Sequence, residues 1–408
     1  MDFGFLDFST LERRKRFCEE ELRLNSRLAA ELYLAVVPIT GTPEQPRLGG
    51  DGTPFEYAIR MRQFDQSQLF DVRQERGDLP ADLLTNLARQ VADFHRSLPP
   101  VSDEKPLGTP EAVYAAMQEN FDQIRPMLDD AGLLAQLDNL EDWTRTTFER
   151  CRDLIAHRRE NGLVRECHGD LHLANITVFN DQVTVFDCIE FNEPFRWIDV
   201  MNDLAFLLMD LESRQEPALA NRVLNTYLEY RGDFEGLALL PLYKAYRAMV
   251  RAKIALFTLG NPNLSEAEKT DLMQRYRSYA QLAEDYGAIP NHYLLATTGL
   301  DGAVVMTFDA ALAATPAEDF IAKILAGRLR ISGAAIGFDF HFGKNRTGSP
   351  AYLTEQGARL GFAVDVVPPL EDEGRPVSSG SIRQALAAGR VVEAAPAEAL
   401  FADPRHPY

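Results

Sequence analysis

The sequence predicts an α+β fold over roughly its first 290 residues and an α/β segment over the remainder. Three observations support this prediction. Residues 112–158 and 197–285 are rich in Leu, Ala, Glu and Arg, with apolar residues at helical spacing. Two short β runs within Ile176–Phe186 flank a hairpin turn. After Pro290, short apolar runs alternate with helical stretches, which is typical of a parallel, doubly wound sheet. The boundary between the two parts is predicted at 285–295.

The first part of the chain is predicted to begin with one helix and a hairpin. Ser9-Thr10 can cap a helix over Leu11–Leu32, because hydroxyl oxygens there accept hydrogen bonds from the first N–H groups of the helix. The runs Tyr33–Ile39 and Phe55–Met61 have the composition of strands, and the second alternates as a half-buried strand does. Gly49–Gly52 is expected to form the turn before the second strand.

The formal net charge is −19, and −16 of it lies in residues 1–290. This acidity argues against nucleic-acid binding and against adhesion to an anionic membrane, since both need clustered Lys and Arg. No apolar run approaches the ~20 residues needed to span a bilayer, and the start lacks a signal-peptide pattern. We therefore expect a cytoplasmic protein. Its cysteines lack metal-type spacing and are expected to be reduced thiols. The cysteines are Cys18, Cys151, Cys167 and Cys188.

The centre of the chain carries the strongest chemical signal. His168-Gly169-Asp170 precedes the β runs, Asn175 lies five residues after the aspartate, and Asp187 ends the second run. This spacing matches the protein-kinase catalytic loop and the metal-binding aspartate that follows it. A carboxylate at Asp170 can orient a substrate hydroxyl and accept its proton. Asn175 and Asp187 offer hard oxygen ligands, which suit Mg²⁺ bound to nucleotide phosphates.

The residues that follow are predicted to form a helix from Trp197 to Glu212. Asp199 and Asp203 lie one turn apart on it, and Arg196 is expected to pair with either carboxylate. Three further side chains are less specific. His172 is interpreted as a loop-packing histidine, and Glu190 and Asn192 are expected to face the substrate cleft.

Residues 1–285 resemble the aminoglycoside phosphotransferase and choline kinase-like superfamily. The motifs that carry the resemblance are Phe3-Gly4-Phe5-Leu6-Asp7-Phe8, Phe17-Cys18-Glu19-Glu20-Glu21-Leu22, Cys167-His168-Gly169-Asp170-Leu171-His172 and Phe186-Asp187-Cys188-Ile189-Glu190-Phe191-Asn192. The resemblance implies an α+β protein-kinase-like fold, with a partial small lobe over 1–65 and a mostly helical large lobe over 66–287. It also implies Mg²⁺ and ATP as cofactors and a small molecule with a hydroxyl group as substrate.

The same resemblance implies a role for each motif residue. Asp170 is the catalytic carboxylate, and Asn175 and Asp187 are the Mg²⁺ ligands. His168 and Asp203 are structural supports of the catalytic loop.

The small lobe of a kinase also supplies a cation for the phosphates and a helical glutamate that pairs with it. Glu20 or Glu21 could be that glutamate. Lys15 is the only lysine in the first 104 residues, and its place among arginines predicts a solvated helix face. Because the superfamily places its lysine on a strand before this helix, we expect a truncated small lobe and reduced or lost phosphotransfer.

The C-terminal part is predicted to alternate strands and helices. The predicted strands are 302–308, 333–338 and 362–367, and the predicted helices are 317–329, opened by a capping box at Thr315-Pro316-Ala317-Glu318, and 350–360, with a further helix to Ala388. The run Gly337–Lys344 follows a strand but does not have the spacing of a Walker A loop. Ser378 and Ser379, with Arg383 one turn later, can hold a phosphate at a helix N-terminus.

Residues 298–395 resemble the FAD synthetase (FMN adenylyltransferase) module of bacterial riboflavin kinase/FAD synthetase. The runs that carry it are Met306-Thr307-Phe308, Ala317-Glu318-Asp319-Phe320-Ile321, Gly337-Phe338-Asp339-Phe340 with Phe342-Gly343, and Ser378-Ser379 with Ile382-Arg383. The resemblance implies an α/β Rossmann-like nucleotidyltransferase segment over 296–408, with FMN or FAD as ligand. It places Asp339 near the flavin and nucleotide cleft, and Ser378, Ser379 and Arg383 on ATP phosphates.

This second segment departs from the family at two points. Gly380 replaces the usual Thr, and none of the seven histidines forms the family's His-x-Gly-His loop. Adenylyl transfer by this segment alone is therefore not expected.

Three functional hypotheses remain open at this point. The first is Mg²⁺·ATP-dependent phosphotransfer to a small-molecule hydroxyl, the second is FMN adenylyl transfer, and the third is an inactive nucleotide- or flavin-binding fusion.

Overall fold

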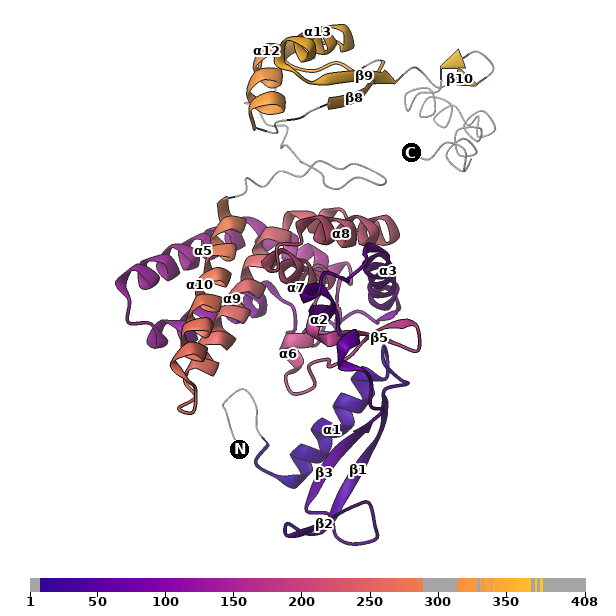
Figure 1. Ribbon diagram of the computed structural model, residues 1–408, viewed down its shortest axis with the longest axis vertical. Coiled ribbons are helices and arrows are strands. Elements are labelled where there is room, and N and C mark those ends of the chain that lie inside the picture. Colours follow the sequence, from indigo (N-terminus) through magenta and orange to yellow (C-terminus); the bar gives the residue numbers. More distant parts are fainter. Residues whose placement is uncertain are drawn as a thin grey trace. The chain divides into compact units, whose positions relative to one another are not determined.

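The computed structural model describes residues 8–288 and 314–376, apart from 329–330, 332, 339, 368–370 and 373–374. The chain divides into two compact units, Met1–Val304 and Val305–Tyr408, and each is described by itself (Figure 1). The boundary predicted at 285–295 falls mostly outside the described residues and stays a prediction. No helix in the described ranges is both long and apolar enough to cross a membrane.

The first unit begins with a small lobe of one helix and three strands. Its elements are α1 (Leu11–Asn25), β1 (Tyr33–Thr42), β2 (Gln45–Leu48) and β3 (Glu56–Met61). The strand order is β2-β1-β3, and both pairings are antiparallel (Figure 1). The two predicted strands are confirmed, while β2 was not predicted, because its four residues are all exposed and show no apolar alternation.

The predicted end of the first helix is wrong. Thr10 caps α1 as expected, since its hydroxyl accepts a hydrogen bond from the Arg13 N–H at 3.3 Å. The helix ends at Asn25 rather than Leu32. The Ser26 hydroxyl donates to the Leu22 carbonyl at 2.6 Å, and the Arg27 guanidinium donates to the Leu24 carbonyl at 2.9 Å. Side chains thus satisfy the last carbonyls of the helix, which lets the chain turn toward β1.

The large lobe is mostly helical. Its helices are α2 (Phe70–Glu75), α3 (Ala81–Ser97), α4 (Pro110–Ile124), α5 (Ala131–Glu160), α6 (Glu193–Arg196), α7 (Val200–Ser213), α8 (Pro217–Arg231), α9 (Leu240–Leu259) and α10 (Glu266–Ala288), with short 3₁₀ turns η1 (Gln66–Gln68), η2 (Arg125–Met127), η3 (Leu173–Asn175) and η4 (Glu235–Ala238). Its strands form two antiparallel pairs, β4 (Val164–Glu166) with β7 (Trp197–Asp199) and β5 (Ile176–Phe179) with β6 (Gln182–Val185). The long helical stretches predicted from the sequence are confirmed.

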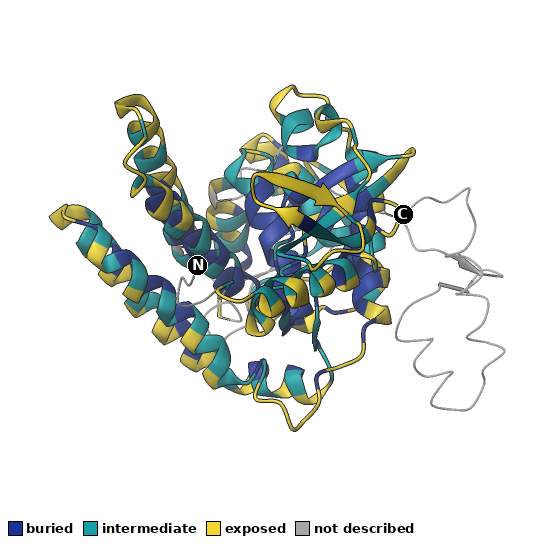
Figure 2. Cartoon of the chain, turned by 90° about the horizontal axis from the view of Figure 1, so that it is seen from below, coloured by how far each residue is buried: buried dark blue, intermediate teal, exposed yellow. Residues whose placement is uncertain are grey.

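The core of this lobe is built around α7. Every residue from Val200 to Leu211 is buried, which is the pattern of a helix enclosed on all sides. Helices α8 and α9 pack against it, α3 packs on α8, and α10 packs on α9. The outer helices carry one buried and one exposed face, and the buried residues gather at the centre of the lobe (Figure 2).

The helix predicted to begin at Trp197 is wrong over its first three residues. These form β7, which pairs with β4 in the register Val164–Asp199 to Glu166–Trp197. The helix starts only after Asp199, whose carboxylate accepts the Met201 N–H at 2.8 Å. An aspartate at this position is a helix cap, and it fixes where the strand changes into α7.

The second unit contains a parallel strand pair joined by a helix. Strand β8 (Gly333–Gly337) pairs with β9 (Ala363–Val367), and α13 (Pro350–Leu360) connects them, as predicted. The remaining described elements are α12 (Ala317–Asp319), η5 (Phe320–Arg328), η6 (Lys344–Arg346), β10 (Glu371–Asp372) and β11 (Arg375–Pro376).

The predicted helix through Leu329 is only partly right. It continues beyond α12 as the π-helical segment η5, and the predicted capping box does not form. The Thr315 carbonyl accepts the Lys344 N–H at 2.7 Å, while the Pro316 carbonyl accepts the first helical bond, from the Phe320 N–H at 2.9 Å. The helix therefore starts one residue later than a capping box on Thr315 requires.

Candidate active site

A tight hairpin brings the two ends of the predicted catalytic segment together. Asn180 and Asp181 both adopt left-handed backbone angles, with φ of 49° and 59°, which form the two-residue turn that β-hairpins favour. The Phe186 N–H donates to the Asn175 carbonyl at 3.0 Å, so the second strand returns directly beside the catalytic loop. Asp187 follows with φ of 68°, a conformation that Asp and Asn tolerate better than most residues.

Two side chains of the catalytic loop contact the Asp170 carboxylate. The Asn175 amide donates to the Asp170 carbonyl at 3.0 Å and to its carboxylate at 3.1 Å. The His172 Nε2 atom lies 3.3 Å from the same carboxylate, so His172 does more than pack in the loop. The Asp170 side chain is about one third exposed, at 32%. The loop thus holds one carboxylate in a fixed orientation at an accessible surface.

The Asp170 carboxylate stays ionised over the physiological range. Burial by itself would raise its pKa, but the hydrogen bond and charge of His172, with His168 and Arg251 further away, lower the pKa to about 2. An ionised carboxylate is the form that can accept a proton from a hydroxyl group.

His168 connects the loop to the hairpin without reaching the surface. It is 1% exposed, and its Nε2 atom lies 2.9 Å from the Phe186 carbonyl. Since a carbonyl only accepts, Nε2 carries the proton and Nδ1 can accept the Asp170 N–H, at 3.3 Å. Burial lowers the pKa of His168, despite the nearby charges of Asp203 and Asp170.

Asp203, a residue of α7, anchors the catalytic loop to this helix. Its carboxylate accepts the backbone N–H groups of His168, at 3.2 Å, and Gly169, at 2.8 Å. It also lies 3.0 Å from the His95 Nε2 atom, and the other ring nitrogen lies 2.8 Å from the Tyr227 hydroxyl. Although this carboxylate is fully buried, the hydrogen bond and charge of His95 lower its pKa to about 2.

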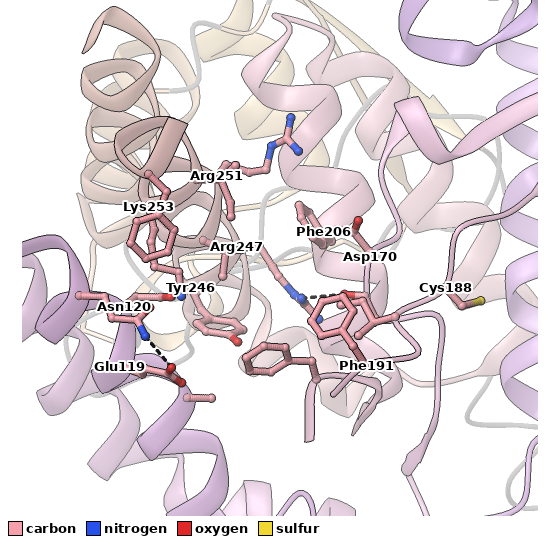
Figure 3. A pocket seen from close by; sticks show the side chains of 18 of the residues that line it. Glu119, Asn120, Asp170, Cys188, Phe191, Phe206, Tyr246, Arg247, Arg251 and Lys253 are labelled. Atoms are coloured by element: carbon pink, nitrogen blue, oxygen red, sulfur yellow. Dashed lines mark hydrogen bonds between the residues drawn. The ribbon is translucent and has the colours of Figure 1, made fainter. Parts of the chain in front are cut away.

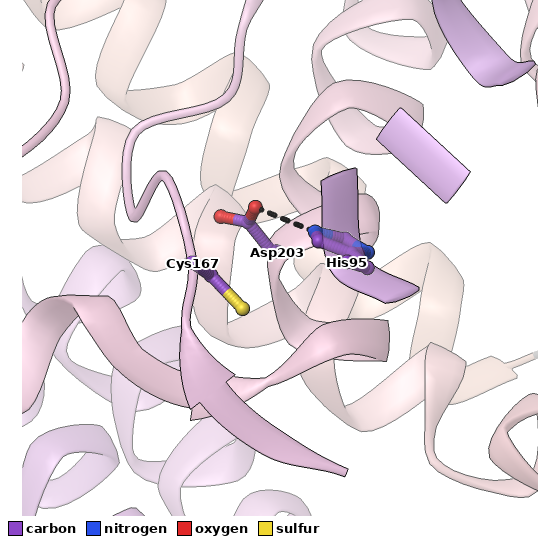
Figure 4. A group of neighbouring side chains, drawn as sticks. All are labelled: His95, Cys167 and Asp203. Atoms are coloured by element: carbon purple, nitrogen blue, oxygen red, sulfur yellow. Dashed lines mark hydrogen bonds and ion pairs between the residues drawn. The ribbon is translucent and has the colours of Figure 1, made fainter. Parts of the chain in front are cut away.

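His95, Cys167 and Asp203 lie close enough together to suggest a metal site (Figure 4). Both nitrogens of His95 and both oxygens of Asp203 already have hydrogen-bond partners. Cys167 is fully buried, and burial raises its pKa well above the ordinary value, which disfavours the thiolate that metals bind. The group is therefore a hydrogen-bonded support of the catalytic loop.

The two candidate glutamates of α1 have different neighbours. Glu20 pairs with Arg23 at 2.8 Å and with Arg196 at 3.5 Å. Glu21 has no ion pair within the described residues, and burial, followed by the charges of Glu190 and Asp187, raises its pKa to about 7. Of the two, Glu21 is the one that shares the electrostatic environment of Asp187.

Lys15 lies where the sequence predicted it, on a solvated face. Its side chain is 47% exposed, its ammonium group lies 3.5 Å from Glu19, and it rests over the Tyr57 ring. No Lys or Arg pairs with Asp187 or Glu21 in the part of the chain that the structure describes. The phosphate-holding cation of a kinase small lobe is therefore not found among these residues.

Two acidic residues, Asp187 and Glu190, follow the hairpin. Asp187 lines the cavity described below, and partial loss of contact with water, together with the charge of Asp170, raises its pKa. Burial, with the charge of Asp187, raises the pKa of Glu190 to about 7. Carboxylates that raise one another's pKa in this way favour binding of a cation, because a cation offsets their mutual repulsion.

The raised pKa of Glu190 predicts a pH-dependent stability. The folded state binds this proton more tightly than the unfolded state between about pH 4.5 and pH 7, so the stabilisation present below pH 4.5 is lost as the pH rises through 7. In metal-free buffer, Glu190→Gln should raise the free energy of unfolding by about 1–2 kcal/mol at pH 8 and leave it unchanged at pH 4. Urea denaturation at both pH values measures this. Glu193→Gln, at an exposed carboxylate paired with Lys105, is the control, and an equal gain for both variants would contradict the assignment.

The donor set fits a magnesium ion. Asn175 uses its amide N–H groups on Asp170, and its side-chain oxygen makes no hydrogen bond within the described residues. The Asp187 carboxylate has no ion-pair partner there either. One amide oxygen and one carboxylate beside the site are hard ligands of the type that Mg²⁺ prefers.

A cavity of about 320 Å³ opens beside the catalytic loop (Figure 3). Asp170 and Asp187 line it on one side, and residues of α4, α7 and α9 line the others, together with Glu190 and Phe191. Asn192, which was expected to face the cleft, does not line this cavity. The cavity places the ionised Asp170 next to a space large enough for a small organic molecule.

The expected pairing of Arg196 with Asp199 or Asp203 is wrong. Arg196 binds Glu166 at 3.1 Å and approaches Glu20 at 3.5 Å, and so joins the large lobe to α1. Asp199 instead forms an ion pair with Arg158, a residue 41 positions earlier in the chain. Helical spacing could not reveal this, because Arg196 ends α6 and the strand β7 separates it from α7.

Sequence reasoning also missed residues that hold the site together. The Asn25 side chain accepts the Cys188 N–H at 2.9 Å and so fixes the end of α1 to the residue after Asp187. Arg247 donates to the Gly169 carbonyl at 3.0 Å. Each contact spans far more of the chain than any local motif, and neither residue carries a local signal of its role.

The candidate residues of the second unit lie outside the described residues. These are Asp339, Ser378, Ser379 and Arg383. The loop around Asp339 is described on both sides. Phe342 is buried, and Gly343 has φ of 74° and approaches Ala317 so closely that an added Cβ would lie 2.6 Å from its Cα atom. A glycine is required at this position.

Two family models match the sequence. Residues 5–240 match the model described as the phosphotransferase enzyme family, and residues 290–381 match the model described as FAD synthetase. Both matches agree with the resemblances drawn from the motifs.

Curated relatives cover the two parts separately. An uncharacterized protein of Mycobacterium tuberculosis is 31% identical over 265 residues, which are 63% of this chain and 51% of the relative. The bifunctional riboflavin kinase/FMN adenylyltransferase of Escherichia coli is 37% identical over 93 residues, 23% of this chain and 30% of that protein. The chain thus spans about half the length of the first relative and under a third of the second.

Solved structures of low sequence identity match about two thirds of the chain. An amicoumacin kinase in complex with AMP-PNP, Ca²⁺ and Ami is 14% identical, with a TM-score of 0.42, over 66% of this chain and 79% of that chain. A choline/ethanolamine kinase family protein from Mesorhizobium loti is 15% identical, with a TM-score of 0.41, over 66% of this chain and 83% of that chain.

Proposed function

This chain belongs to the phosphotransferase enzyme family, and from that premise we propose that it transfers a phosphoryl group from Mg²⁺·ATP to the hydroxyl group of a small molecule. The observation that carries the proposal is the constellation around Asp170. Its carboxylate is ionised, the Asn175 amide orients it at 3.1 Å, and it shares a cavity with Asp187. Members of such families use these residue types at these positions for phosphoryl transfer.

In this proposal Asp170 orients the substrate hydroxyl and accepts its proton as the new bond to phosphorus forms. His172 and Asn175 hold the carboxylate in place, and His168 and Asp203 hold the loop. Asn175 and Asp187 would hold Mg²⁺, which supplies positive charge against the phosphate oxygens. The roles of these residues remain proposals.

We expect slow turnover. Glu21 and Asp187 lack a cationic partner among the described residues, and Lys15 is engaged by Glu19 on an exposed face. Without a cation at this place, fewer charges hold the nucleotide phosphates, so ATP should bind weakly.

Thermal denaturation in the presence of ligands tests the nucleotide site. With Mg²⁺·ATP at about ten times its Kd, the melting temperature should rise by about 3–5 °C. ATP with EDTA should give no rise, and Asp187→Asn should abolish the rise with Mg²⁺·ATP. Asparagine is the appropriate replacement because the backbone at 187 is left-handed.

Asp181→Asn is the matched control, since Asp181 is exposed and also has a left-handed backbone. It should keep the full shift. Equal shifts with and without Mg²⁺, or an unchanged shift in Asp187→Asn, would contradict the proposed metal site.

A second candidate function concerns the second unit. The parallel pair β8 and β9, joined by α13, and the match of residues 290–381 to FAD synthetase favour binding of FMN or an adenine nucleotide there. A rise in melting temperature with FMN or FAD that persists in Asp187→Asn would support it. FMN adenylyl transfer and an inactive nucleotide- or flavin-binding fusion remain the alternatives to the proposed phosphotransfer.

A further inference from the structure

The backbone on the two sides of Asp187 is held by side chains from different lobes. The Phe186 carbonyl, in the peptide before Asp187, accepts the His168 Nε2 proton at 2.9 Å. The Cys188 N–H, in the peptide after Asp187, donates to the Asn25 side-chain oxygen at 2.9 Å. His168 belongs to the catalytic loop, whereas Asn25 is the last residue of α1. Since these two planar peptides define φ and ψ of Asp187, the two hydrogen bonds fix its backbone conformation.

Asp187 depends on such support because its backbone conformation is unfavourable. Its φ of 68° lies in the left-handed region, which a residue with a Cβ atom seldom adopts. A residue keeps such a conformation only where its surroundings over-determine the geometry. The direction in which the carboxylate leaves the chain, and with it the position of the proposed metal ligand relative to Asn175, follows from this backbone conformation.

The Asn25 side chain is itself fixed in orientation. It is fully buried, and its amide N–H donates to the Glu21 carbonyl, one turn earlier in α1, at 2.9 Å. With the nitrogen held there, the oxygen faces the Cys188 N–H. An amide suits this place because it donates on one side and accepts on the other. One side chain thus connects the α1 turn that contains Glu21 to the peptide that follows Asp187.

The end of α1 is also joined to the large lobe by other contacts. The Arg27 guanidinium donates to the backbone carbonyls of Glu166, at 2.6 Å, and Cys167, at 3.2 Å, which directly precede the catalytic loop. Tyr33, the first residue of β1 and 4% exposed, makes a hydrogen bond with the Asp187 backbone. The small lobe therefore contacts the backbone on both sides of the proposed metal site.

We propose that Asn25 is a positioning residue for the metal ligand Asp187, through which the small-lobe helix α1 sets how tightly the site binds its divalent cation. The proposal rests on the proposed function for the assignment of Asp187 as a ligand. Asn25 acts through the peptide after Asp187 rather than through contact with the cation. Removal of a partner that orients a metal ligand typically weakens metal binding by about 10- to 100-fold.

Binding of Mn²⁺·ATP to the full chain tests the proposal without any turnover. Mn²⁺ is a paramagnetic substitute that prefers the same oxygen ligands as Mg²⁺, and the change in water-proton relaxation on binding gives the Kd. Asn25→Leu keeps the approximate size of the side chain but cannot accept the Cys188 N–H, so the Kd should rise about tenfold. Asn25→Ala also lacks an acceptor and should give the same rise, so it replaces Asn25→Leu if leucine does not fit.

Asn25→Asp tests whether the hydrogen bond to the Cys188 N–H is the cause. It should keep the Kd within about threefold of the wild-type value, because a carboxyl group accepts this N–H in either protonation state. When protonated, it can also donate to the Glu21 carbonyl, as the amide does. Recovery by aspartate but not by leucine or alanine would assign the effect to the acceptor at position 25.

Asn161→Leu is the matched control. Asn161 closes α5, and its amide donates to the His157 carbonyl, one turn earlier, at 2.8 Å, as Asn25 does to Glu21. In the described part of the chain, all hydrogen bonds of its side chain go to His157. The same replacement therefore removes the same helix-end bond away from the proposed metal site, and the Kd should stay within about twofold of the wild-type value.

The possible results separate this inference from the proposed function. A wild-type Kd in both Asn25→Leu and Asn25→Ala, an equal rise in Asn161→Leu, or an equal rise in Asn25→Asp would overturn the positioning role and leave the proposed phosphotransfer standing. A wild-type chain that did not alter the relaxation of Mn²⁺·ATP would contradict the proposed metal site, and the positioning role with it.

Discussion

Asp170→Asn is expected to lower the rate of phosphoryl transfer by about 100-fold or more, because an amide cannot accept the proton of the substrate hydroxyl. The replacement keeps the size of the side chain and its place near Asn175 and His172. The structural effect should therefore be small, and the loss should appear in kcat rather than in the melting temperature. Transfer of labelled phosphate from ATP to the accepted alcohol measures the rate at the low turnover expected of this chain.

Two comparisons make this result specific. Asp181→Asn, the same replacement in the hairpin turn, should retain the wild-type rate. Asp170→Asn should also retain the Mg²⁺·ATP thermal shift, since the proposed ligands Asn175 and Asp187 are intact. A variant at Asp170 that turned over ATP and alcohol at the wild-type rate would remove Asp170 from the mechanism.

Arg158→Met is expected to lower the free energy of unfolding by about 3–5 kcal/mol, the largest effect on stability foreseen here. The side chain is completely buried and binds Asp199 at 2.7 and 2.8 Å and Asp233 at 2.6 and 2.8 Å. Methionine fills much of the space but leaves two buried carboxylates without a cation. Their desolvation is then uncompensated, and α5, β7 and the segment before η4 lose their common anchor.

Arg152→Met on the same helix is the matched control. Arg152 also contacts a carboxylate, that of Glu111, but its side chain is 42% exposed. Exposed ion pairs contribute little, so the change should stay below about 1 kcal/mol. Guanidinium denaturation of both variants measures the difference, and a similar small loss in each would show that the buried network is not what stabilises the lobe.

The sequence predicted the parts of the site that are local in the chain. The α+β protein-kinase-like fold is confirmed, as is the hairpin between Ile176 and Val185. These predictions succeed because a two-residue turn and a loop of fixed spacing leave few conformations open. The positions of Asp170, Asn175 and Asp187 follow from that geometry, whereas their roles in catalysis stay predictions.

The sequence predicted neither the end of α1 nor several contacts between distant segments. Helix α1 stops at Asn25 because side chains satisfy its last carbonyls, although the apolar pattern continues to Leu32. Arg196 binds Glu166 rather than a neighbour in sequence. In both cases the local pattern was compatible with more than one structure, and the side-chain contacts of the folded protein decided between them.

The sequence by itself determined the two family resemblances, the hairpin that carries Asp187, and the parallel β8–β9 pair. It could do so because these features depend on turn residues, strand alternation and fixed spacing, which act over a few residues. Only the tertiary structure decided that Glu21 rather than Glu20 lies near Asp187, that Asp203 and His95 hold the catalytic loop, and that residues of α4 and α9 line the cavity beside Asp170. Such features depend on which side chains burial brings together, and a charge or an unused donor gains its meaning only from the neighbours that exclude water from it.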